Sequence, residues 1–81
     1  MVLYNVTIKV EHFIEAEWLE WMKNEHIPQM KATGCFYDAG IYKLLDTDES
    51  DGITYAVQYH AADHDSYKQY LLNYSAEMRK R

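Results

Sequence analysis

Hydrophobic and polar positions alternate at the start of the chain, between Leu3 and Val10. Successive side chains of an extended strand point to opposite faces, so this period of two predicts a half-buried β-strand. One face would carry Tyr4, Val6, Ile8 and Val10, and the other Leu3, Asn5, Thr7 and Lys9.

The next segment, from Ile14 to Lys31, changes to helical spacing. Its apolar residues recur at multiples of four positions, at Ile14, Trp18, Met22 and Met30. Acidic side chains occupy its first turns, where the helix dipole favours them, at Glu15, Glu17 and Glu20. This pattern predicts an amphipathic helix whose Trp18 and Met22 belong to the core, with Trp21 at the margin of the stripe and available to a dimer interface.

This helix also contains an interruption and a stop signal. Pro28 has no backbone N–H and clashes with the carbonyl group of Asn24, so we expect a kink or a restart there. The pair Thr33-Gly34 is expected to end the helix, because glycine readily adopts the left-handed conformation of a C-terminal cap.

Two further strands are predicted at Cys35–Asp46 and Ile53–Ala61, on either side of a polar run that ends in Asp51-Gly52, a pair that tight turns favour. They would form an antiparallel hairpin. In the second strand the apolar face holds Ile53, Tyr55, Val57 and Tyr59. The buried face of the first strand stays open between two sets, and Gly40 marks a bulge that would switch the register midway. The two sets are Phe36, Tyr42 and Leu44 against Tyr37, Ile41 and Leu45.

A second helix is predicted after the hairpin, capped by Asp63 or Asp65. Its apolar residues repeat at spacings of three and four, at Tyr67, Tyr70, Leu71, Tyr74 and Met78. The basic residues 79–81 would complement its C-terminal dipole, and residues 73–75 are a candidate interruption.

The order of these elements, β-α-β-β-α, predicts an α+β fold of the ferredoxin-like type in one domain, residues 1–81. Its antiparallel sheet would have both helices on one face. The complete plan has the spatial strand order 4-1-3-2, and its fourth strand, beside the first, is missing. A chain this short buries only roughly 60–65% of its unfolded surface, so association that covers the bare edge is expected.

Several short motifs carry a resemblance over nearly the whole chain. They are Tyr4-Asn5-Val6-Thr7, Trp18-Leu19-Glu20-Trp21-Met22, Glu25-His26-Ile27-Pro28, Thr33-Gly34, Leu44-Leu45-Asp46 and the run from Gly52 to Tyr59. With them the chain resembles the short bacterial domain-of-unknown-function family numbered 4286. The resemblance implies a fold of the dimeric α/β-barrel type, whose members carry further residues after the second helix that supply the fourth strand. No function is established for that family, so the resemblance implies no chemistry.

Composition narrows the choice of partners. The formal charge is −5, and the only two arginines are at the C-terminus, so we expect neither a nucleic-acid nor a membrane partner. The single cysteine, Cys35, cannot form an internal disulfide, which favours a reducing compartment and predicts a cytoplasmic protein. No apolar stretch approaches the roughly 20 residues that a membrane helix needs.

Metal and cofactor chemistry finds little support in the sequence. His26 and His60 would form a pair only if both pointed inward, and no two histidines have one-face helical spacing. Asp46, Asp48 and Ser50 resemble the start of a calcium loop, but its glycine position holds Asp51. We therefore expect no metal and no cofactor, and we interpret the loop as a solvated turn.

The remaining candidate site is the polar face of the sheet. Its proposed ligand-binding residues are Asn5, Thr7, Gln58 and His60, with Tyr37 or Tyr42 according to the hairpin register, and His26 from the helix. In dimeric barrels two such faces close on each other and enclose a space for a small ligand. The simpler interpretation, which we favour, is that these side chains satisfy one another across a dimer interface.

Two function classes follow. The first is a noncatalytic homodimeric module that associates through the sheet face or the edge of the first strand. The alternative, which rests on fold analogy, is a small enzyme similar to cofactor-independent monooxygenases or isomerases. It would use His60 or His26 as base and Tyr37 or Tyr42 as proton donor.

Overall fold

The computed structural model describes residues 1–75 and contains the elements that the periodicities predict, in the order β-α-β-β-α. Three strands, β1 (Val2–Val10), β2 (Asp38–Lys43) and β3 (Ile53–Ala61), make one sheet. A continuous helical rod joins β1 to β2. The rod consists of η1 (His12–Ile14), α1 (Glu15–Trp21), η2 (Met22–His26) and α2 (Ile27–Ala32), and the chain continues after β3 with α3 (His64–Asn73).

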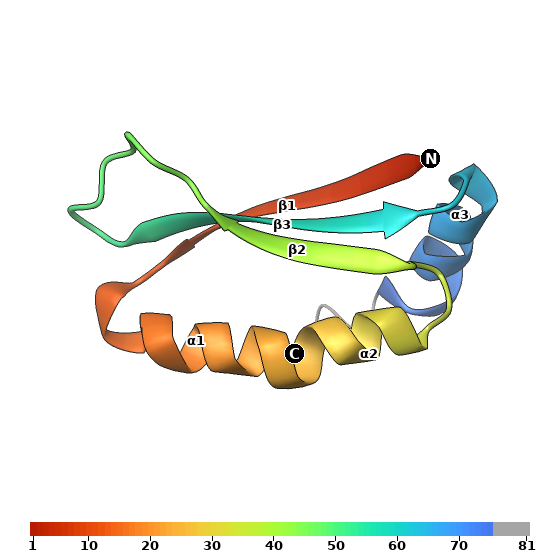
Figure 1. The fold of residues 1–81 in the computed structure, drawn as a ribbon, viewed down its shortest axis with the longest axis horizontal. Helices are drawn as coiled ribbons and strands as arrows, with labels where there is room; N and C mark the ends of the chain where they lie inside the picture. The colour runs from red at the N-terminus through yellow and green to blue at the C-terminus, as the bar shows by residue number, and fades with distance from the viewer. Residues whose placement is uncertain (76–81) are drawn as a thin grey trace.

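The sheet confirms the ferredoxin-like expectation for the three strands. Its order is β1-β3-β2, and both outer strands run antiparallel to β3. Val57 at the middle of β3 pairs with Val6 on one side and Ile41 on the other. The helical rod lies along one face of the sheet, and no helix formed by residues 1–75 lies on the opposite face (Figure 1). Within residues 1–75 no strand pairs with the outer edge of β1, which is where the complete plan places its fourth strand.

The rod changes its helical geometry next to Pro28, as expected, but on the N-terminal side of the proline. Residues Met22–His26 form a π-helix, and the N–H group of Ile27 bonds to the carbonyl oxygen of Met22. Pro28 then occupies the first turn of α2, where its missing N–H costs least.

The end of the rod confirms the predicted stop signal. The Thr33 hydroxyl donates to the Met30 carbonyl oxygen at 2.7 Å, and Gly34 adopts φ +79° while its N–H bonds to Lys31.

The core is an aromatic cluster between the sheet and the helices. Tyr4 of β1 lies at its centre, with ring centroids 5.4–6.2 Å from those of Phe36, Tyr59, Tyr67 and Tyr70. Tyr67 and Tyr70 come from α3, which packs at the end of the sheet rather than along it (Figure 1). The helix-facing side of β1 is therefore only half-buried beyond Tyr4, at Val6 and Ile8.

Strand β2 corrects two expectations. It begins at Asp38 instead of Cys35, because the Cys35 N–H bonds to the Thr33 side chain and is part of the helix cap. The predicted bulge at Gly40 is wrong, since Asp38–Lys43 pairs with β3 without a break. The alternation of side chains between the two faces does change, but at the bend of Tyr37 and not at Gly40. This change places Phe36 in the aromatic core.

The hairpin loop, residues 44–52, is longer than a tight turn. Asp51-Gly52 does not form its tip. Gly52 instead passes beside the end of β1, and a side chain at this position would collide with the Val10 carbonyl group. The Asp48 carboxylate accepts the Ser50 N–H at 2.9 Å, which also holds the pKa of Asp48 below its usual range.

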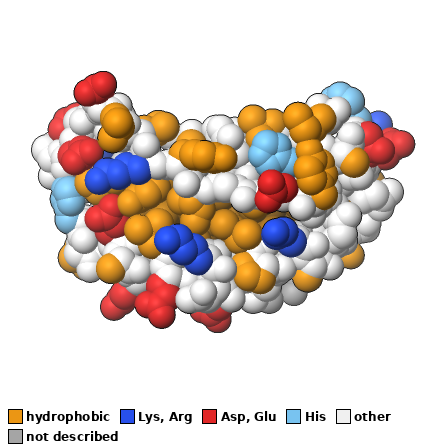
Figure 2. Space-filling model, in the orientation of Figure 1, with side chains coloured by type: hydrophobic (Ala, Val, Ile, Leu, Met, Phe, Trp, Pro, Cys, Tyr) orange, Lys and Arg blue, Asp and Glu red, His pale blue; other side chains and the backbone are white. Residues whose placement is uncertain are grey.

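Acidic and hydrophobic side chains occupy different parts of the surface. Acidic side chains gather around the hairpin loop and the outer side of the rod, while hydrophobic side chains show along the seam between the rod and β2 (Figure 2). Among the described residues, no helix has the length and apolar character required to cross a membrane.

Candidate functional site

The register of the strands assigns the side chains of the uncovered sheet face, which we call the open face. Directly paired residues share a face, so Asn5 lies beside Gln58, and Thr7 and Tyr42 flank Ala56 from the two outer strands. The open face is formed by Leu3, Asn5, Thr7 and Lys9 of β1, Thr54, Ala56, Gln58 and His60 of β3, and Asp38, Gly40 and Tyr42 of β2.

Most of the predicted site residues come together on or beside this face. Asn5, Thr7, Gln58, His60 and Tyr42 belong to it. Tyr37 lies beside it, because its ring centroid is 6.0 Å from that of His60 and its hydroxyl donates to the Met1 sulfur. The Asn5 amide donates to the Thr7 hydroxyl at 3.2 Å, so two of these polar groups already satisfy each other.

His26 lies on the other side of the sheet, among the helices. Its ring stacks on Trp21, with centroids 4.7 Å apart and planes inclined by 21°. His26 and His60 thus belong to opposite faces and do not form the pair considered from the sequence. Within residues 1–75 no cluster of three or more His, Cys, Asp or Glu side chains has the geometry to hold a metal ion.

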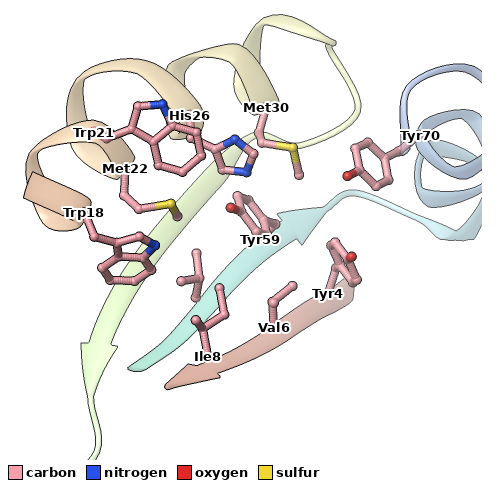
Figure 3. A pocket seen from close by; sticks show the side chains of 11 residues that line it. Tyr4, Val6, Ile8, Trp18, Trp21, Met22, His26, Met30, Tyr59 and Tyr70 are labelled. Carbon is pink, nitrogen blue, oxygen red and sulfur yellow. The ribbon is translucent and has the colours of Figure 1, made fainter. Parts of the chain in front are cut away.

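His26 instead helps to line a cleft between the rod, the sheet and α3. The volume of this cleft is about 300 Å³. Figure 3 shows side chains from the rod directed toward those that rise from β1 and β3. The cleft is lined by Trp18, Trp21, Met22, His26 and Met30 of the rod, Tyr4, Val6, Ile8, Val57 and Tyr59 of the sheet, and Tyr70 of α3.

Two buried tyrosines of β3 stay protonated well above neutral pH. Burial first, and then its hydrogen bond to the Glu15 carboxylate at 2.5 Å, raise the pKa of Tyr55 to about 12. Burial is also the main cause that raises the pKa of Tyr59, with the neighbouring Tyr70 and Tyr4 adding to it. The Tyr59 hydroxyl in the cleft is therefore available as a hydrogen-bond donor over the whole physiological range.

The Cys35 side chain is part of the protein core. Its side chain is 6% exposed and belongs to the aromatic core cluster, and its thiol donates to the Thr33 carbonyl oxygen at 3.9 Å. Such a setting is that of a small buried hydrophobe.

The family model of the domain of unknown function DUF4286 matches residues 1–81. The chain belongs to the DUF4286 family. Neither the curated proteins nor the solved structures contain a significant match.

For this DUF4286 domain, the open face was predictable from residue alternation, whereas the cleft was not. Trp18 and Met22 belong to a stripe of apolar residues at helical spacing, a pattern that is typical of core packing. The stripe faces the cleft because of the position of α3. No local sequence pattern indicates where α3 lies. The proline that follows the π-helix is the one local signal near the cleft.

Proposed function

We propose that this DUF4286 protein is a noncatalytic homodimeric module and that two copies pair through their open faces. The main support is the two-sided character of the sheet: helices pack on one face, while the other presents exposed hydrophobic side chains. Leu3 is 48% exposed, Tyr42 50% and the adjoining Tyr37 56%. An uncovered patch of this kind is typical of an interaction surface.

The charges of the open face favour pairing between two copies. Lys9 and Asp38 are its only residues of the Asp, Glu, Lys and Arg types, and they lie on the two outer strands, β1 and β2. The central strand contributes Thr54, Ala56, Gln58 and His60, none of which is Asp, Glu, Lys or Arg. Burial of this centre against a second copy would leave both charged residues at the rim, where water still solvates them.

We further propose that the protein works in the cytoplasm. Cys35 supports this assignment, because a buried thiol within the core cluster stays intact in a reducing compartment.

The dimer can be tested by substitution on the central strand, which has no free edge. We expect the wild-type protein to be a dimer at about 20 μM in sedimentation equilibrium, and Gln58→Arg to shift it toward monomer by at least about tenfold in dissociation constant. The reason is that two arginines would face each other across the two-fold axis. Gln69→Arg, the same change at an exposed position of α3, is the matched control and should leave the dimer intact.

A monomeric wild type at this concentration would contradict the proposal. So would a Gln58→Arg variant that remains dimeric while its circular dichroism spectrum shows a folded chain.

A further inference from the structure

The cleft between the rod and the sheet has the walls of a ligand pocket. Its rod wall carries the two tryptophans of the chain, Trp18 and Trp21, together with two methionines, whose flexible thioethers adapt to bound aromatic groups. Its floor is the apolar strip formed by Val6, Ile8 and Val57. An apolar ligand in this space would cover the half-buried apolar side chains that line it, such as Val6, Ile8 and Trp18.

Polar groups gather at the end of the cleft near α3. The ring centroids of Tyr59 and Tyr70 lie 5.8 and 5.7 Å from that of Tyr4, so three phenol rings meet there. Figure 3 shows the His26 ring directed into the same space from the rod, opposite Tyr59. The other end, at Ile8 and Trp18, is mainly apolar. A ligand would therefore be oriented, with its polar group toward α3.

The lining also restricts the charge of a ligand. Among residues 1–75, no Asp, Glu, Lys or Arg side chain lines it. A charged group that entered the cleft would lose its hydration with none of these four side-chain types of residues 1–75 to pair with, and this penalty is large. The cleft thus favours a neutral molecule.

The volume of the cleft sets the size of the ligand. An apolar cavity of about 150 Å³ holds one benzene ring, so a space of about 300 Å³ suits roughly two rings, or ten to twelve non-hydrogen atoms.

The π-helix is an independent observation at the same place. The segment Met22–His26 lines the cleft with both its first and its last residue. π-Helical turns are rare and occur frequently at functional sites. Here the wider turn directs Met22 and His26 toward the sheet.

We propose that the cleft binds a neutral planar molecule of two rings with one hydrogen-bonding group. The rings lie between the Trp18 and Met22 side chains and the floor of β1 and β3, and the polar group meets the Tyr59 hydroxyl. This site does not rest on the dimer, because the cleft and the open face are on opposite faces of the sheet.

The test uses 2-naphthol as the probe, with naphthalene and 2-naphthoate as its apolar and anionic counterparts. Isothermal titration calorimetry should give one 2-naphthol per chain with a Kd below about 1 mM, and 2-naphthoate should bind at least about tenfold more weakly. The two tryptophan indole N–H signals in a ¹⁵N NMR spectrum should shift with the same Kd, because both indoles line the cleft.

Two variants locate the bound molecule. Val6→Phe fills the floor of the cleft and should weaken 2-naphthol binding at least about tenfold, whereas Val2→Phe, the same change on the same face of β1 but outside the cleft, should not. Tyr59→Phe should weaken 2-naphthol about three- to tenfold and leave naphthalene unchanged, since only the hydroxyl is lost.

Other results would overturn the assignment. Absence of saturable binding by the wild type, equal affinity for 2-naphthoate, or unchanged affinity in a folded Val6→Phe variant would each do so. Indole signals that move with protein concentration while no probe binds would mean that a second copy covers the cleft.

Discussion

A single hydroxyl group at Tyr55 connects the start of the rod to the centre of the sheet. It donates to the Glu15 carboxylate, while the ring packs on Trp18 with centroids 5.1 Å apart. The side chain is only 6% exposed, so the hydrogen bond is made in a largely desolvated place, where loss of a partner is costly. This contact positions the first turn of α1 over β3 and thereby one end of the cleft.

Removal of this hydroxyl should destabilise the protein at neutral pH. We expect Tyr55→Phe to lower the free energy of unfolding by about 1 kcal/mol in urea titrations, because the hydrogen bond to Glu15 is lost. Tyr42→Phe, at a half-exposed position of the open face, should change it much less.

The same residue predicts a dependence on alkaline pH. The folded pKa of Tyr55, about 12, exceeds the value of 10.0 in the unfolded chain. Its contribution is therefore complete below pH 10 and lost as the pH rises toward 12, so the stability of the wild type should fall more steeply there than that of Tyr55→Phe. Parallel curves for the two proteins would contradict this assignment.

At the scale of elements, α3 shows how a short polar signal sets a helix start. Its N-cap is Asp63, whose carboxylate accepts the Ser66 N–H at 2.8 Å, and this bond holds the pKa of Asp63 below its usual range. The sequence left Asp63 and Asp65 as equal candidates, because both precede the helical pattern. Asp65 lies inside the first turn. The choice depends on the extended backbone at residue 63, which side-chain chemistry alone does not report.

These two aspartates make a matched pair for a stability test. Asp63→Ala should lower the thermal unfolding midpoint by several degrees, and Asp65→Ala by clearly less, because only the former removes the capping bond. The difference should vanish in acid, since the folded pKa of Asp63 is below 3.8 and the cap is lost as the pH falls through it. Equal midpoints for the two variants at pH 7 would contradict the cap assignment.

At the scale of the whole molecule, the strands and helices were predictable because each has one apolar and one polar side. The alternation in β1 and β3 and the four-residue spacing along the rod are local patterns, and the order of the elements that they predict defines fold class and strand order. The register of β2 was not predictable, because the bend at Tyr37 follows from the packing of Phe36 into a cluster built by three distant segments. The cleft depends in the same way on the placement of α3.

Hydrogen exchange should report the sheet as a whole. We expect the amides of β3, paired on both sides, to be uniformly slow, and those of β1 to alternate between slow and fast, since every second N–H group of β1 points away from β3. Uniform protection along Val2–Val10 would show that another strand pairs with this edge, and the dimer would then involve β1.

The position of β1 also has a consequence for the time course of folding. Val2 pairs with Ala61 and Val10 with Ile53, so the first strand to leave the ribosome finds its partner only after most of the chain has been made. At about 5–20 residues per second, the interval between Val10 and Ile53 lasts roughly 2–9 s. During that time an apolar strand has no place to pair within its own chain. Nascent β1 is therefore the segment for which a chaperone that shields extended peptides would matter most.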